Sequence, residues 1–244
     1  MLAITGFAAG GCGASSTAAA GTAGAGPPLS ATATSSAGKT TSATGERSAA
    51  SVSSAATSGH RPSHRAPDPG RLPQTNQLPS ASTRTFKTEM SDLWRAVQLG
   101  TVGPGVPAFF PEAAYVQIKA IANAQSDFRY RLLADYALDI RAAHALLGSG
   151  ARNAQLVKVL VPGSYAHWVP PNACYNRYGY YEVPNARVVY RSGGQLHSFG
   201  IASMISWRGV WYVVHLGAVL RNAATGVVDD PSSGTGVSAP SSTC

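Results

Sequence analysis

Three histidines have the residue type and the strand positions that a metal site could use. His167, His197 and His215 fall in three different segments that the sequence predicts as strands, and imidazole nitrogens are common zinc ligands. Pairing the strands through their turns, however, puts His197 and His215 on opposite faces of the sheet. Because the ligands of one ion must converge, we predict no metal site and no cofactor.

Cys174 and His215 suggest a second chemistry, in which a thiol attacks and an imidazole accepts its proton. No signature of a cysteine-dependent enzyme surrounds Cys174. The chain also lacks GxxxxGK[ST] and GxSxG, and no βαβ pattern supports a GxGxxG loop. We therefore predict no catalytic residue. The sequence leaves two alternatives for Cys174, a buried free thiol or a disulfide with Cys244.

A third group could bind a ligand. In the same strand pairing Arg187 lies opposite Gly200 and His215 lies opposite Ala202, with Trp211 on the same face. The two small residues leave room for a pocket, so Arg187, Trp211 and His215 are our candidate ligand-binding residues. The alternative, which we favour, is that the third predicted helix covers this face and the small residues let it approach.

The strands that position these residues lie within 186–217. Gly193-Gly194 and Arg208-Gly209 have the spacing of two-residue hairpin loops, which predicts three consecutive antiparallel strands. The resulting register puts most large apolar side chains on one face, the predicted core face: Val188, Tyr190, Phe199, Ile201, Ile205, Trp207, Val210, Tyr212, Val214 and Leu216. A bulge would shift the residues beyond it to the opposite face.

Three helices are predicted before the sheet. The first ends at Gly100, the second begins at Pro111, and the third covers about 127–147. One face of the third helix carries charges at every fourth position: Asp127, Arg131, Asp135 and Asp139. This spacing is typical of a solvated ladder of ion pairs and is a weak argument for acid/base chemistry.

The period of the sequence changes to that of strands after the third helix. Short strands are predicted at 156–161, 165–169 and 180–183, ahead of the three central ones. Helices followed by five or six strands predict an α+β fold, in which N-terminal helices pack on a curved, cone-like antiparallel sheet.

Composition divides the 244 residues into four parts. After a signal remnant over 1–12, the Ala/Ser/Thr/Gly/Pro-rich stretch 13–85 has too few apolar residues to form a core, so it is predicted as a disordered tether. The domain is predicted at 86–228, followed by a disordered tail at 229–244. The net charge of +8 is spread along the chain. Such diffuse positive charge is expected of a protein that lies near anionic lipid or wall polymers. A nucleic-acid binder requires a concentrated basic stripe, so no nucleic-acid partner is predicted.

The N-terminus MLAITGFAAGGCGASS runs from an apolar stretch through small residues to Cys12. This order resembles the end of a bacterial lipoprotein signal, in which the cysteine is lipidated and becomes the new N-terminus. The resemblance implies an extracytoplasmic protein that is anchored to the membrane through Cys12, or secreted. No Lys or Arg precedes the apolar run, which a start codon farther upstream would explain. The alternative is an unprocessed apolar N-terminus in a cytosolic protein.

The element order of residues 90–220 carries a second resemblance. A helix with a tryptophan, a break, the segment FFPEAAYVQIKA, a further helix and a curved sheet resemble the nuclear-transport-factor-two-like superfamily. This cone is shared with ketosteroid isomerase and with many secreted bacterial accessory domains. Its enzymes place aspartate, tyrosine or arginine inside the cone. Here Glu182 is the single acid of the predicted sheet, so the resemblance favours the non-catalytic members, which bind a ligand or a partner protein.

We therefore predict a non-catalytic domain of the cell envelope that binds a small ligand or an envelope protein. One alternative is a small hydrolase or isomerase that uses the interior of the cone, which an acid beside His215 would favour. Another is a structural interaction domain, which predicts a flat aromatic patch and no cavity. Its surface would consist of Tyr175, Tyr178, Tyr180 and Tyr181.

Overall fold

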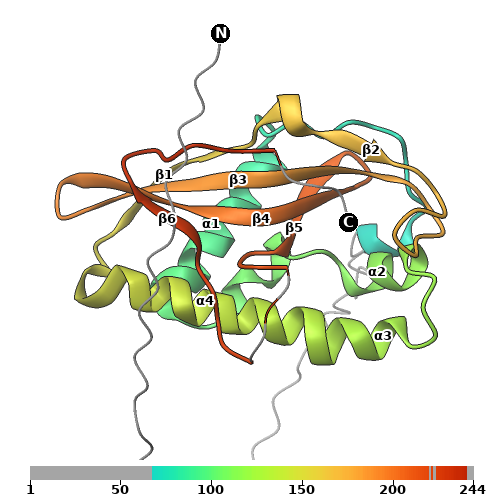
Figure 1. Cartoon of the computed structure of the whole chain (residues 1–244), viewed down its shortest axis with the longest axis horizontal. Helices are drawn as coiled ribbons and strands as arrows, with labels where there is room; N and C mark the ends of the chain where they lie inside the picture. Colours follow the sequence, from blue (N-terminus) through green and yellow to red (C-terminus); the bar gives the residue numbers. More distant parts are fainter. Residues whose placement is uncertain (1–67, 220, 222–223, 241–244) are drawn as a thin grey trace, which may run out of the picture. The chain divides into compact units, whose positions relative to one another are not determined.

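A computed structural model describes residues 68–219, 221 and 224–240, which belong to the compact unit Arg61–Cys244. The predictions for Cys12, Cys244 and the tether up to residue 67 lie outside the described residues. Helices pack on a six-stranded antiparallel sheet that does not close into a barrel (Figure 1). The predicted α+β fold is confirmed.

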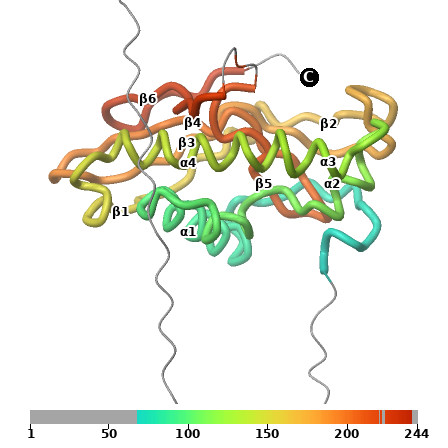
Figure 2. The backbone as a smooth tube through the Cα atoms, turned by 90° about the horizontal axis from the view of Figure 1, so that it is seen from below, coloured from blue at the N-terminus to red at the C-terminus, as the bar shows by residue number. Residues whose placement is uncertain are grey.

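The first helix, α1, spans Arg84–Leu99 and is bounded by two local signals. Thr83 Oγ1 accepts a hydrogen bond from the Phe86 amide at 3.2 Å, and Gly100 ends the helix with a φ of 65°. Trp94 packs on Tyr190 of the sheet, with ring centroids 5.3 Å apart. In Figure 2, α1 lies at the bottom of the view and β6 at the top, with β3 and β4 between them.

The helix α2, Glu112–Ile118, follows Pro111 as predicted. The long third helix has three parts: α3 at Ala124–Asp127, a π-helical turn at Phe128–Leu132, and α4 at Leu133–Leu147. Four short 3-10 turns complete the helical segments: Pro69–Arg71, Gly103–Ala108, Gly148–Gly150 and Gly163–Tyr165.

The strands are β1 (Gln155–Leu160), β2 (His167–Val169), β3 (Tyr180–Ser192), β4 (Gln195–Trp207), β5 (Val210–His215) and β6 (Asp229–Ser233). Their order is β1-β3-β4-β5, with β2 also beside β3 and β6 also beside β4. The predicted strand 180–183 is the first part of β3, which continues through Pro184. Asn185, between the pairs of Pro184 with Ser203 and of Ala186 with Ile201, has a φ of 53°.

Both predicted hairpin loops are confirmed. Gly193 and Gly194 have φ values of 57° and 80°, and Arg208 and Gly209 have 53° and 77°. Positive φ at both central residues is the requirement of the type I′ turn, whose twist matches that of the flanking strands. The register beside the loops is the predicted one, with Trp207 opposite Val210.

A bulge in β5 changes the register farther from the loop. Met204 pairs with Val213 but Ser203 pairs with His215, so Val214 is an extra residue. The predicted pairs of Ser203 with Val214 and of Ala202 with His215 are therefore wrong. The bulge puts His215 on the face of the sheet that carries Ser203, the predicted core face.

The ordered domain extends beyond the predicted limits of 86–228 at both ends. At its start, Trp207 Nε1 donates to the Pro69 carbonyl at 2.8 Å, and the Gln74 side chain bonds to Ser206 and Arg208. At its end, the predicted disordered tail contributes β6, Asp229–Ser233, which pairs with β4. Neither segment shows a helical or strand period of apolar residues, and the hydrogen bonds that attach them leave no pattern in the sequence.

The predicted solvated ladder on the third helix is wrong for Asp139, which is 1% exposed. Its carboxylate accepts from the amides of Gly217 and Val227 at 2.9 Å each, and from Arg221 at 2.9 and 3.0 Å. Asp139 thus fixes the segment that connects β5 to β6.

Among the described residues, no helix is long and apolar enough to cross a membrane.

Candidate ligand-binding cavity

A cavity of about 560 Å³ lies between α2, the π-helical turn and strands β3 to β5. This volume is within the range of small-molecule sites, roughly 300–1,000 Å³. Its lining residues come from both layers: Tyr115, Ile118, Lys119, Arg131, Leu132, His167, Tyr180, Glu182, Pro184, Ala202, Ser203, Ile205, Val214, His215 and Val219.

The apolar part of the wall has contributions from each layer. Ile118 at the end of α2 and Leu132 in the π-helical turn are buried on the helical side, and Ile205 of β4 is buried on the sheet side. The β5 bulge adds Val214 next to His215. Residues on both sides of a bulge can face the same way, so this irregularity supplies two consecutive lining residues.

Lys119 directly follows α2 and is half-buried in the wall. Its Nζ donates to the Cys174 carbonyl at 3.2 Å. Within the described part of the chain, no carboxylate lies within 4.0 Å of this ammonium. Burial lowers the pKa of Lys119, and the charge of Arg131 lowers it further.

Arg131 stands beside Lys119 but already has a counter-charge. Its Nε and Nη2 donate to the two oxygens of Asp127 at 2.7 and 2.6 Å, and Nη2 also lies 3.2 Å from the Tyr115 hydroxyl. This hydroxyl donates to Asp127 at 2.5 Å. Hydrogen bonding to Arg131 is the main cause that lowers the pKa of Asp127, so the carboxylate is charged. Such π-helical turns are often found at functional sites, and this one carries Arg131 and Leu132.

Glu182 of β3 is the acid of the cavity wall. Ser203 Oγ donates to Glu182 Oε1 at 2.9 Å, and His167 Nε2 lies 3.7 Å from Glu182 Oε2. His167 Nδ1 is 3.0 Å from the Tyr165 carbonyl. A nucleophilic serine requires a hydrogen bond to a base such as histidine. Ser203 donates to a carboxylate instead, and among the described residues no histidine nitrogen is bonded to its hydroxyl.

His215 is uncharged at neutral pH. Burial, together with the nearby charges of Arg131 and Arg221, lowers its pKa from 6.5 to about 4. His215 therefore adds a hydrogen-bonding group to the cavity but no positive charge.

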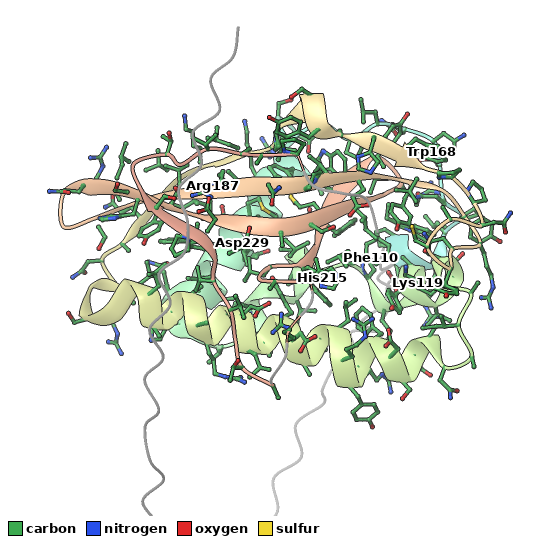
Figure 3. The ribbon with its side chains drawn as sticks, viewed as in Figure 1. Phe110, Lys119, Trp168, Arg187, His215 and Asp229 are labelled. Atoms are coloured by element: carbon green, nitrogen blue, oxygen red, sulfur yellow. The ribbon has the colours of Figure 1, made fainter. Side chains whose placement is uncertain are left out.

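The three predicted ligand-binding residues do not lie together. Only His215 lines the cavity, whereas Trp211 is buried at 2% exposure and Arg187 belongs to the opposite face from His215. The candidate pocket beside Trp211 is therefore not open, and this face is covered, as the favoured alternative expected, although the C-terminal segment and not the third helix lies over Gly200 and Arg187. Figure 3 shows Arg187 toward the β3–β4 hairpin and Lys119 at the α2 end.

The small residue Gly200 makes room for neither a ligand nor the third helix. A Cβ atom there would lie 2.1 Å from Asp229 Oδ2, so Gly200 admits β6. The same C-terminal segment covers Arg187, which donates to Asp230 at 2.6 Å and to Ser198 Oγ at 2.7 Å.

The other predicted chemistries have the following outcomes. His197 and His215 are on one face after the bulge, but six positions along β4, about 20 Å, separate their levels in the sheet. No three His, Cys, Asp or Glu side chains in the described part of the chain are placed to hold a metal ion. Cys174 is disulfide-bonded, so the free-thiol alternative is wrong. Its predicted partner, Cys244, lies outside the described residues.

The four tyrosines do not form one exposed patch. Tyr175 and Tyr178 are 77% and 51% exposed, but Tyr180 is 4% exposed and lines the cavity. The predicted combination of a flat surface and no cavity is wrong.

The sequence pattern does not indicate that four residues of the cavity wall belong to one site: Tyr115, Lys119, Arg131 and Ser203. A partial signal was present, because Tyr115 and Ile118 mark the buried face of α2 and Lys119 is adjacent to it. Glu182 is the single acid of the predicted sheet, but its position inside the cavity follows from the three-dimensional register.

Comparison of the chain with protein-family models, with curated proteins and with solved structures gives no match.

Proposed function

We propose that this chain is a non-catalytic binding domain of the bacterial cell envelope, which holds a small organic molecule in the cavity between α2, the π-helical turn and β3 to β5. The observation that carries the proposal is the cavity itself, about 560 Å³, in which apolar side chains from both layers stand beside polar and charged groups. This combination is typical of small-molecule sites. The resemblance to the nuclear-transport-factor-two-like superfamily supports a site between helices and sheet, and the resemblance around Cys12 supports the envelope location.

Binding is preferred over catalysis because of how Glu182 is held. Glu182, the single acid of the predicted sheet, lies in the cavity wall, and this position favours the enzyme alternative. However, Oε1 accepts from Ser203, and Oε2 is buried. A general base must lie within hydrogen-bonding reach of the proton that it abstracts. Oε1 is bonded to Ser203, and Oε2, which has no hydrogen-bond partner among the described residues, has no exposed surface that a substrate could reach.

The neutral fluorescent probe N-phenyl-1-naphthylamine tests the binding function. Its emission rises in an apolar site, and we expect saturable binding at one site per chain. Ala202→Phe places a ring at the cavity wall and is expected to weaken binding about tenfold or more, because the ring and the probe compete for the same space. Ala145→Phe, at an exposed position of α4, is the matched control and should bind the probe as the wild type does.

Two results would contradict the proposal. One is the absence of saturable binding to the wild-type domain. The other is unchanged binding by a folded Ala202→Phe variant, which would place the probe outside the cavity. Circular dichroism of both variants checks that they are folded.

A further inference from the structure

We propose that the ligand of this cavity is an apolar molecule with a single carboxylate, and that Lys119 binds the carboxylate. This inference rests on the proposed binding function and specifies its ligand class. It rests on the charged groups of the cavity wall, Lys119, Arg131 and Glu182.

Lys119 has unused binding capacity. An ammonium group has three N–H donors, and Nζ uses one of them, on the Cys174 carbonyl at 3.2 Å. Among the described residues no acidic oxygen lies within 4.0 Å of it. Removing a charge from water is unfavourable unless it is paired. A ligand carboxylate would supply the missing counter-charge and accept the two remaining hydrogen bonds.

The neighbouring groups leave one positive charge uncompensated on this side of the cavity. Asp127 neutralises Arg131 through two short hydrogen bonds, and His215 is uncharged at neutral pH. Arg131 nevertheless disfavours the charged form of Lys119. An anion bound at Lys119 would offset that repulsion, so the site favours one negative charge.

Glu182 limits the charge of the ligand from the other side. It lines the same cavity and is close enough to influence Lys119 electrostatically. A second negative charge on the ligand would be repelled by this carboxylate in a partly desolvated space. The same cavity wall carries the apolar side chains of Ile118, Leu132 and Ile205. These features select a monoanion with an apolar body over a phosphate or another dianion.

Three probes of nearly equal size test the inference: 2-naphthoate, the uncharged 2-naphthalenemethanol, and the dianionic 2-naphthyl phosphate. Their dissociation constants are measured by competition with N-phenyl-1-naphthylamine at pH 8. We expect 2-naphthoate to bind about ten- to a hundredfold more tightly than the alcohol, as for one hydrogen bond to a charged group. Naphthyl phosphate should bind more weakly than the carboxylate.

Lys119→Met keeps most of the aliphatic chain and removes the charge. In this variant 2-naphthoate should lose its advantage over 2-naphthalenemethanol, while the alcohol still binds. Lys158→Met removes a charge from an exposed position of β1 and is the control for net charge, so the advantage should be unchanged.

The outcomes separate this inference from the proposed function. Equal binding of the carboxylate and the alcohol by the wild type would overturn the inference and leave the cavity function standing. Tighter binding of the phosphate would overturn the preference for a monoanion. A folded Lys119→Met variant that retains the carboxylate advantage would assign it to another residue. If none of the probes binds, including the neutral one, the proposed function itself fails. The wild-type comparison does not depend on the folding of any variant.

Discussion

Glu89 is a buried acid of α1 that makes no ion pair in the described part of the chain. It is 8% exposed, and its Oε2 has no hydrogen-bond partner among the described residues. Burial, together with the charge of Asp92, raises the pKa of Glu89 from 4.5 to about 8. The folded protein therefore holds Glu89 protonated at a pH where the unfolded chain releases the proton.

The sign of the pH effect follows from this difference. Between about 4.5 and 8 the folded state binds more protons at Glu89 than the unfolded state, so the free energy of unfolding falls as the pH rises. Glu89→Gln imitates the neutral form and should not show this loss. We expect the stability of the variant relative to the wild type to increase by roughly 1.4 kcal/mol per pH unit between pH 5 and pH 8, about 4 kcal/mol in total, measured by urea denaturation. A constant difference across this range would show that Glu89 ionises normally.

At the residue scale, the sequence predicted types of chemistry better than positions. The hairpin loops and the register beside them could be derived from glycine spacing, which is why the pairs near Trp207 and Tyr190 are correct. The position of His215 could not, because one extra residue at Val214 moves it to the other face. Nothing in the local sequence VVHLG distinguishes a bulge from a regular strand.

At the element scale, β6 is the feature that the sequence did not indicate. Its residues, DDPSS, have low strand propensity and contain a proline. They form a strand for two reasons. β5 pairs only with the C-terminal part of β4, so the N-terminal part of β4 has an open edge, to which β6 bonds. Asp230 of β6 also supplies the counter-charge of the buried Arg187. Gly200 and Gly236 then permit the close approach, since a Cβ at Gly236 would lie 2.1 Å from Arg187 Nη2. These are tertiary causes, which a local pattern does not contain.

The two adjacent acids of β6 provide a matched test of this attachment. Asp230 pairs with Arg187, whose side chain is 2% exposed, whereas burial and the charge of Asp230 raise the pKa of Asp229. Asp230→Asn should therefore cost about 2 kcal/mol, between the values of exposed and buried pairs, because Asp230 itself is largely exposed. Asp229→Asn should be neutral or stabilising. Urea denaturation and amide exchange of residues 229–233 measure both effects.

The reverse order of the two variants would contradict the assignment of Asp230 as the counter-charge. Arg187→Met combined with Asp230→Asn completes the cycle, because the variant without either charge leaves no buried cation unpaired. We expect the double variant to be more stable than Asp230→Asn alone.

At the scale of the whole molecule, the sequence predicted where a domain lies, and the structure lengthens it. Hydrogen bonds from Trp207 to Pro69 and from Arg208 to Gln74 attach the segment before α1, and β6 attaches the segment after residue 228. The proposed arrangement of the chain is a lipidated Cys12, a tether over residues 13–67 with a reach of roughly 40 Å, and this extended domain.

Brief trypsin treatment of membranes that carry the full chain tests the arrangement. Lys39, Arg47 and Arg65 lie in the proposed tether, so cleavage there should be fast and should release a soluble fragment that begins at Ala66. Arg84 begins α1, and the Arg221 side chain is paired with Asp139, so cleavage at both should be slow. Mass spectrometry should find the released fragment with residues 69–83 and 229–233 intact, and a lipidated Cys12 peptide in the membrane fraction.

Early cleavage after Arg84 or Arg221 would show that the terminal segments are not attached as described. An unmodified Met1 peptide in the soluble fraction before digestion would contradict the anchor.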